Sequence, residues 1–285
     1  MMLDDTFLPA LIFGLLGLMI GSFLNVVIYR LPIMFALHWG LEFETQPSHL
    51  QNTTSSTPSP FNLAVPASAC PQCGNTLKWW HNIPLLSYVL LKGQCFFCKT
   101  PVSLRYPLVE LSTSLLYLAC FFMYGWSLTA VAWAGFCTIV VVAAGIDWDT
   151  QILPDILTLP LVWAGLVLSN LKIIEVPIEN SVWGAVLGYM VLWTVFWLFK
   201  LITGKEGMGY GDFKFLAAFG AWMGPLAIIP ILLLSCTAGA LIGITLRIKG
   251  NLEQNQAIAF GPYLAVAALI MCLGSNTIYT FLHFQ

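Results

Sequence analysis

The chain has 285 residues, of which 59% are hydrophobic and only 8% are charged, and its formal net charge is -2. A soluble domain carries roughly 25% charged residues, so this composition excludes an ordinary water-covered protein surface. The lysines and arginines form no basic stripe, which argues against a nucleic-acid partner. The composition therefore predicts a polytopic helical membrane protein that is surrounded by the lipid bilayer.

Apolar blocks long enough to cross a bilayer recur along the chain, since a membrane-spanning helix needs about 20 residues. The first block runs from about residue 7 to residue 28 and ends at Tyr29-Arg30. Two aspartates precede it where a signal peptide carries basic residues, so we do not expect a cleaved signal. A long polar segment follows, in which residues 44–68 have the composition of a flexible linker.

Further apolar blocks follow at 107–125, 128–146, 155–171, 181–199, 213–230, 231–246 and 258–282. Two of these expected helices run together around Gly224-Pro225. We therefore expect an all-α chain with about eight transmembrane helices. The expected organisation is a first transmembrane helix in 1–29, a small domain in 30–106 and a membrane domain of about seven helices in 107–285.

Lysine and arginine indicate the orientation of membrane helices, because cytoplasmic loops carry them in excess. All but one of the chain's 11 lysines and arginines fall on one side of the expected helices, and Lys172 alone falls on the other. This bias predicts that the 30–106 domain lies in the cytoplasm. It also predicts that the two ends of the chain lie on the opposite side of the membrane.

The polar segment contains two C-x-x-C pairs, Cys70 with Cys73 and Cys95 with Cys98. About twenty residues separate the pairs, which is close to the spacing in four-cysteine zinc ribbons. Four thiolates complete a tetrahedron around Zn²⁺ and leave no open position for catalysis, so we predict a structural zinc site. Two disulfides or a redox centre are alternatives, although disulfides are rare in a reducing cytoplasm. His81, between the pairs, is a weaker candidate ligand.

Four aspartates are expected at the cytoplasmic edge of the helices: Asp147, Asp149, Asp155 and Asp212. Acidic side chains at a membrane edge are costly without partners and mark functional sites. Asp155 follows a proline and opens an apolar run, as a residue in the first turn of a helix does. Asp149 is consistent with a plain solvated side chain. Gly209 and Gly211 precede Asp212, so the backbone there can turn sharply or admit a substrate strand.

Two carboxyl groups that meet from separate helices at a semi-dry boundary share a proton. The ionised group takes a proton from water while the other donates one to the scissile carbonyl, as in the aspartic proteases. Asp147 and Asp212 are candidates for this arrangement, although their spacing alone does not establish it. A transporter whose acids bind protons or cations is an alternative, but it predicts repeats and acids near the midplane. A metal-bearing scaffold without chemistry leaves the acid pair unexplained.

Four segments carry a resemblance to a known family: GSFLNVVIYRLP at 21–32, the CPQCG and CFFC cysteine pairs, IDWDTQILPD at 146–155 and GMGYGDFK at 207–214. In this order they make the chain closely resemble the bacterial type IV prepilin peptidases. These proteins combine a leader peptidase with an N-methyltransferase. The G-x-G-D pattern is also found in presenilin-like intramembrane proteases, but those lack the cysteine tetrad.

The resemblance implies that Asp147 and Asp212 are the catalytic pair and that Gly209 and Gly211 belong to the active-site motif. The family removes the basic leader of type IV prepilins and type II secretion pseudopilins on the cytoplasmic side of the inner membrane. It then methylates the new N-terminal residue with S-adenosylmethionine. For this chain it implies a multi-pass protein of the bacterial inner membrane with its active site facing the cytoplasm.

No G-x-G-x-x-G motif opens a Rossmann unit, so the residues that bind S-adenosylmethionine are not predicted. The resemblance directs attention to the cysteine domain and to the segment before it, where Asn25, Arg30, Pro32 and Glu42 are candidates for methyl transfer. Asn25 is equally suited to a hydrogen bond between helices, and Arg30 to anchoring at the membrane surface. The sequence does not specify the particular prepilins, the oligomeric state or the route by which a substrate enters.

Overall fold

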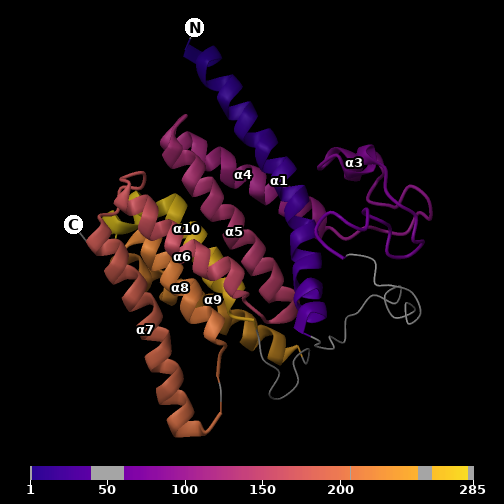
Figure 1. The fold of residues 1–285 in the computed structure, drawn as a ribbon. Helices are drawn as coiled ribbons and strands as arrows, with labels where there is room; N and C mark the ends of the chain where they lie inside the picture. Colours follow the sequence, from indigo (N-terminus) through magenta and orange to yellow (C-terminus); the bar gives the residue numbers. More distant parts are fainter. Residues whose placement is uncertain (1, 40–60, 206, 250–258, 282–285) are drawn as a thin grey trace. The chain divides into compact units, whose positions relative to one another are not determined.

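Residues 2–39, 61–205, 207–249 and 259–281 are described by the computed structural model of the chain. Over these ranges the chain is helical, with two isolated β-bridges and no strand, which confirms the predicted all-α class. Each predicted apolar block corresponds to one helix in Figure 1. These helices are α1 (Met2–Trp39), α4 (Arg105–Tyr124), α5 (Leu128–Thr150), α6 (Asp155–Asn170), α7 (Ile178–Thr203), α8 (Tyr210–Met223), α9 (Ile228–Ile248) and α10 (Gly261–Phe281).

Five spans among the described residues are long and apolar enough to cross a membrane, so this is a multi-pass membrane protein. They are Thr6–His38, Arg105–Tyr124, Leu128–Thr150, Ile178–Thr203 and Pro225–Ile248. The helices α6 and α8 have 16 and 14 residues, fewer than the roughly 20 needed for a perpendicular crossing. The predicted junction is found at Gly224, where a φ of 80° favours glycine and ends α8.

The first helix is longer than the apolar block predicts. α1 continues past Tyr29 to Trp39 with Pro32 inside it, so the helix extends about ten residues beyond the predicted apolar block. A proline in a helix removes one backbone hydrogen bond, and here the helix continues regardless. Arg30 is buried by the protein, with 7% of its surface exposed, although it follows the apolar block directly.

The first of two compact units is Met1–Phe122, in which α1 packs against α4 through small residues. A Cβ atom on Gly17 would lie 2.6 Å from the Cα atom of Ser114. One on Gly21 would lie 2.7 Å from the Cα atom of Glu110. Because real carbon atoms need about 3.5 Å, glycine at these positions lets the two helices approach closely.

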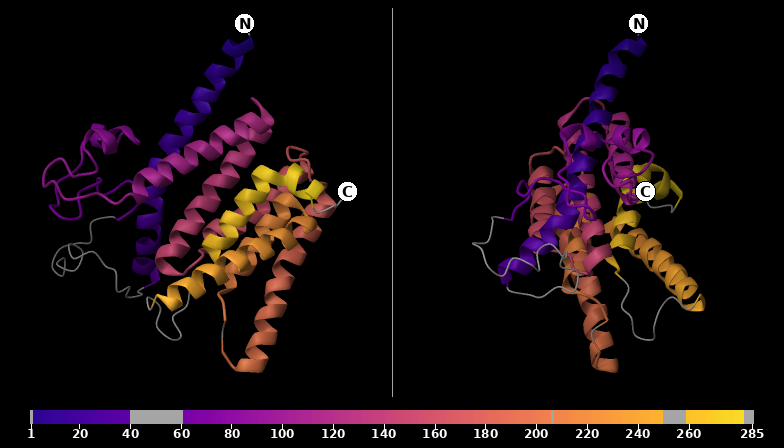
Figure 2. Two further views of the ribbon diagram at one scale, coloured as in Figure 1. Left: turned by 180° about the vertical axis from the view of Figure 1, so that it is seen from behind. Right: turned by 90° about the vertical axis from the view of Figure 1, so that its right-hand side faces the viewer.

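The second compact unit, Met123–Gln285, is organised around α8. α8 contacts α6, α7 and α10, and α10 also lies against α5 and α9 (Figures 1 and 2). The side chains of Phe213 and Trp222 on α8 are almost fully buried. Gly184 of α7 meets α8 backbone against backbone, which brings the two helices close together. This packing holds α8 on several sides and so fixes its first turn, where Asp212 lies.

Candidate active site and metal centre

Asp147 lies in the last turn of α5, and its side chain is buried, with 4% of its surface exposed. The helix ends just beyond it, at Gln151, whose φ of 55° is left-handed and whose N–H donates to the Asp147 carbonyl oxygen at 2.8 Å. The Asp147 carboxylate accepts a hydrogen bond at Oδ2 from the N–H of Gly261, at 2.9 Å. Gly261 is the first residue of α10, so a free amide at a helix start orients the carboxylate.

Asp212 lies in the first turn of α8 and is also buried, with 7% of its surface exposed. Gly209 is the N-cap residue of this helix, and its carbonyl oxygen accepts the Asp212 N–H at 3.3 Å. Gly211 packs on Leu153, because a Cβ atom on Gly211 would lie 2.6 Å from the Leu153 Cβ atom. The glycine therefore allows the start of α8 to press against the segment between α5 and α6.

The structure brings the two predicted acids into one site within the second unit. Both side chains are buried, Asp147 near the end of α5 and Asp212 at the start of α8. Leu153 connects their surroundings, since it packs on Gly211 and lies 3.1 Å from where a Cβ atom on Gly261 would stand. Two buried carboxyl groups that share one site can divide one proton between them, as acid–base catalysis on a peptide requires.

The other two aspartates have different surroundings. Asp149 is exposed, on the same helix as Asp147. Asp155 opens α6 and forms an ion pair with Lys214 of α8, with Asp155 oxygens 2.6 Å and 2.7 Å from the Lys214 Nζ atom. Asp155 is the more exposed partner, with 56% of its side-chain surface accessible, so the pair contributes at most about 1 kcal/mol. The sequence interpretation placed Asp155 correctly at a helix start but did not identify its partner.

Sequence reasoning missed Gly261 and Leu153 as parts of the acid site. Gly261 is followed by Pro262 at the start of the last apolar block, and proline in the first turn is a signal for a helix start. That signal locates unpaired amides but does not say which acid they meet. Leu153 has no signal at all, because a leucine beside an apolar block looks like any core residue.

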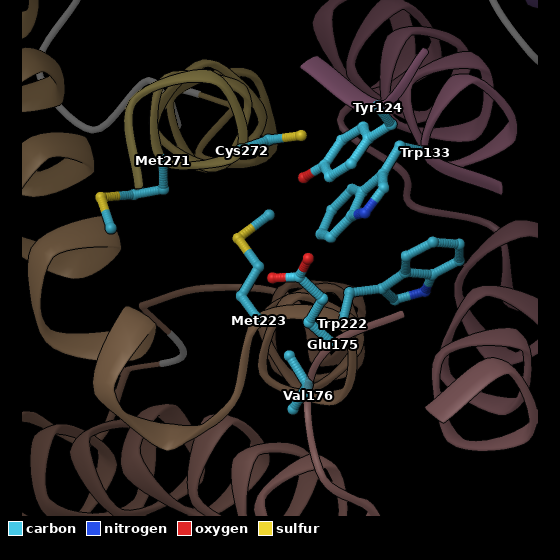
Figure 3. Close-up of a pocket in the computed structure, with 8 residues that line it drawn as sticks. All are labelled: Tyr124, Trp133, Glu175, Val176, Trp222, Met223, Met271 and Cys272. Carbon is cyan, nitrogen blue, oxygen red and sulfur yellow. The ribbon is translucent and has the colours of Figure 1, made fainter. Parts of the chain in front are cut away.

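A cavity of about 100 Å³ lies elsewhere in the second unit (Figure 3). It is lined by Tyr124, Trp133, Glu175, Val176, Trp222, Met223, Met271 and Cys272. Trp133 precedes Asp147 on α5 by a distance along the helix of about 20 Å, at 1.5 Å per residue. The cavity is therefore separate from the acid pair, and neither acid lines it.

The four predicted cysteines of the first unit also come together. The Sγ atoms of Cys70, Cys73, Cys95 and Cys98 all lie within 4.8 Å of one another, and all four are free thiols. The Sγ atoms of Cys70 and Cys98 are 3.8 Å apart. Four sulfurs at 2.3 Å from a tetrahedral Zn²⁺ are separated by about 3.8 Å, so the donor set and spacing fit a closed metal site.

The two cysteine pairs adopt the same backbone turn. The backbone N–H of Cys70 donates to the backbone carbonyl oxygen of Asn75 at 3.0 Å. The backbone N–H of Cys95 donates in the same way to the carbonyl oxygen of Thr100 at 2.9 Å. An isolated antiparallel bridge closes each turn, Ala69 with Thr76 and Gln94 with Pro101. This duplicated turn is the expected geometry for two knuckles that present four thiols to one ion.

Thr100 contacts one of the four thiols. Its hydroxyl lies 3.1 Å from the Cys98 Sγ atom, and hydrogen bonds from Thr100 lower the pKa of this thiol to about 6. A thiolate is the form that binds metal. His81 is not in the sulfur cluster; its ring stacks on Phe96 with centroids 4.9 Å apart.

Two polar side chains, one on α1 and one on α4, form hydrogen bonds with the backbone of the cysteine domain. The Arg30 guanidinium donates to three carbonyl oxygens, those of Asn62, Leu63 and Pro66, at 3.0, 3.3 and 2.7 Å. Glu110 on α4 accepts the N–H of Leu85 at 2.8 Å. In this structure Arg30 therefore holds the start of the cysteine domain against α1.

Of the other candidates for methyl transfer, Asn25 forms the predicted bond between helices. Its Nδ2 atom donates to the carbonyl oxygen of Tyr106 on α4 at 3.2 Å. Pro32 lies inside α1. Glu42 lies outside the described residues, and the structure assigns none of these candidates to a binding site for a methyl donor.

Taken with the helices, the buried acid pair and the four-thiol cluster define a multi-pass membrane protein of the aspartyl-peptidase type. Comparison with known families agrees: the Bacterial Peptidase A24 N-terminal domain matches residues 15–124, and the Type IV leader peptidase family matches residues 134–244. The chain belongs to the type IV leader peptidase family, as its sequence motifs predicted.

Similar proteins align over almost their full length. A prepilin leader peptidase/N-methyltransferase of Aeromonas salmonicida is 48% identical, over 95% of this chain and 94% of the relative. The protein of the same name from Pseudomonas aeruginosa is 45% identical, over 95% of this chain and 92% of the relative. That from Pseudomonas putida is also 45% identical, over 93% of this chain and 90% of the relative. No solved structure matches the chain. These relatives give no support to the transporter alternative.

Proposed function

We propose that this chain is a membrane endopeptidase that uses Asp147 and Asp212 to remove the leader of type IV prepilins and type II secretion pseudopilins, and that it then methylates the new N-terminal residue with S-adenosylmethionine. The names of its relatives support the paired activities. The observation that carries the peptidase assignment is the pair of buried carboxyl groups on α5 and α8, whose surroundings are joined by Leu153.

In this mechanism one carboxylate takes a proton from a water molecule, whose oxygen bonds to the scissile carbonyl carbon. The other carboxyl group donates its proton to the carbonyl oxygen, which gives a tetrahedral diol. When the diol collapses, the C–N bond breaks and the leaving nitrogen takes up a proton. The Gly261 amide holds Asp147 Oδ2 in a fixed direction throughout, so one of the two acids is oriented before the substrate arrives.

The two glycines of the motif have different roles in this proposal. A Cβ atom on Gly209 would have no neighbour nearer than 3.9 Å, and its next is Asp212 Oδ2 at 4.0 Å. The space above Gly209 is therefore open beside the catalytic carboxyl group, where the backbone of a substrate can approach. Gly211 is instead required by the fold, because Leu153 occupies the position of its side chain.

The acid pair is proposed to face the cytoplasm of a bacterium from the inner membrane. The bias of lysine and arginine to one side of the helices supports this orientation. A basic leader would be attracted to an acidic site at that edge. Residues 107–285 are proposed as the peptidase domain, and the match of the leader peptidase family to residues 134–244 lies within them.

The cysteine domain, in residues 30–106, is proposed to hold a structural Zn²⁺. When bound, the ion crosslinks the two knuckles and supplies no chemistry, because Cys70, Cys73, Cys95 and Cys98 fill its coordination. Methyl transfer is proposed for the first unit, which the family's N-terminal domain matches. Arg30 and Glu110 serve it by holding the cysteine domain against α1 and α4.

The test is to mix the purified protein with a full-length prepilin and to follow the mass of the substrate with and without S-adenosylmethionine. We expect the mass to fall by that of the leader in both cases, and to rise by one methyl group only when the donor is present. An unchanged prepilin would refute the peptidase assignment. Cleavage followed by no methylation would refute the second activity alone.

A further inference from the structure

The cysteine domain displays a connected group of aromatic rings, in which Trp79, Trp80, Phe96 and Phe97 are exposed and His81 is half-buried between them. The ring centroids of Trp79 and Trp80 are 5.4 Å apart, those of His81 and Phe96 are 4.9 Å apart, and those of Phe96 and Phe97 are 5.3 Å apart. Trp79 is 76% exposed. Such a concentration of exposed aromatic surface marks an interaction site. We call this group the aromatic patch.

Lysines border the aromatic patch. The Lys78 ammonium lies 5.0 Å from the Trp80 ring centroid, and that of Lys99 lies 5.4 Å from the Phe96 ring centroid. The sequence from 61 to 109 contains three lysines and one arginine and no aspartate or glutamate. Even with four thiolates around one divalent ion, the segment carries a net positive charge, so its partner is expected to be negatively charged.

The short helix α3 (Leu86–Leu90) adds a second apolar surface. Its Leu86, Val89 and Leu90 side chains are exposed, Leu90 by 71%, and their spacing places them on one face of the helix. Leu85, immediately before α3, is hydrogen-bonded to Glu110. Because Glu110 lies within the candidate span Arg105–Tyr124, this bond holds α3 beside the end of a membrane helix.

We propose that the aromatic patch and the apolar face of α3 bind the surface of the bilayer, with Lys78, Lys92 and Lys99 on the head groups of anionic phospholipids. Tryptophan and lysine together are the typical anchors of this interface. The basic leader of a prepilin is a poorer partner, because the segment is itself positively charged. The proposal is independent of the peptidase activity, and it assigns the cysteine domain a position on the membrane.

The test uses the full-length protein labelled with fluorotryptophan in nanodiscs of phosphatidylcholine with or without phosphatidylglycerol. The Trp79→Phe and Trp80→Phe variants assign the two fluorine resonances. A lipid with a nitroxide at its head group should broaden them more than the resonance of the buried Trp222, which a Trp222→Phe variant assigns. The difference should be larger in nanodiscs with phosphatidylglycerol.

A matched pair of triple variants tests the charge. K78Q/K92Q/K99Q should reduce the broadening in anionic nanodiscs, whereas K172Q/K205Q/K249Q, which changes three exposed lysines elsewhere, should leave it unchanged. The metal content of each purified variant shows whether its cysteine domain is intact. The comparison of nanodiscs with and without phosphatidylglycerol uses the unaltered protein, so it does not depend on the folding of any variant. Resonances broadened by a water-soluble nitroxide but not by the lipid would overturn the proposal. If neither nitroxide broadens the resonances, the aromatic patch is covered by protein, and the proposal is overturned.

Discussion

Replacing Gly211 by alanine is expected to damage the acid site through Leu153. The new Cβ atom would lie 2.6 Å from the Leu153 Cβ atom and 3.1 Å from its carbonyl oxygen. Carbon atoms need about 3.5–4.0 Å, so α8 and the segment before α6 must separate by about 1 Å. Overpacking of this kind costs about 1–3 kcal/mol of folding free energy. Because Asp212 is the next residue, its carboxyl group moves too, and a 1 Å misplacement lowers a rate by about 10²-fold.

The measurements are thermal unfolding of the purified protein and kcat/KM for prepilin cleavage. Gly209→Ala is the matched control for stability, since a Cβ atom there has no neighbour within 3.9 Å and the φ of -80° is ordinary. We expect Gly209→Ala to change the free energy of unfolding by less than about 0.5 kcal/mol. A Gly211→Ala protein that unfolds and cleaves like the unaltered one would refute the packing account.

Three further outcomes are expected. Gly261→Ala places a Cβ atom 2.6 Å from Asp147 Oδ2 and disturbs the amide hydrogen bond to it, so kcat should fall by about 10-fold or more, measured at saturating prepilin. Removing the metal with a chelator should raise the rate of hydrogen exchange throughout residues 68–102, and Cys70→Ser should have the same effect. A wild-type protein that is purified without metal would contradict the closed metal site. Lys214→Gln breaks the exposed ion pair with Asp155 and should change the free energy of unfolding by less than about 1 kcal/mol, by thermal unfolding; a larger loss would mean the pair is structural.

The helices were predictable because each apolar block is close to the length of one membrane helix, and block length does not depend on tertiary contacts. The end of α1 was not predictable in the same way. Its last turns carry a proline and a buried arginine, and the helix persists while Arg30 binds carbonyl oxygens in a segment more than thirty residues away. A local pattern cannot report a partner that only the folded chain supplies.

Some residues of the candidate site could be predicted from the sequence and others could not, for the same reason. Asp147, Asp212 and the four cysteines could be proposed from the sequence because carboxyl groups and thiols are rare enough in apolar surroundings to stand out. Gly261 and Leu153 were missed because one acts through its backbone amide and the other through its volume. Side-chain chemistry is visible in a sequence, whereas backbone donors and packing are visible only in the fold.

The central claim is that Asp147 and Asp212 together activate water against a peptide bond. The most direct measurement is the rate of leader release from a prepilin by Asp147→Asn and Asp212→Asn, with Asp149→Asn as the control on the same helix. We expect each of the first two to lose about 10³-fold or more in rate while remaining folded in the membrane, and the control to stay active. Leader release at the normal rate by either Asp147→Asn or Asp212→Asn would contradict the account.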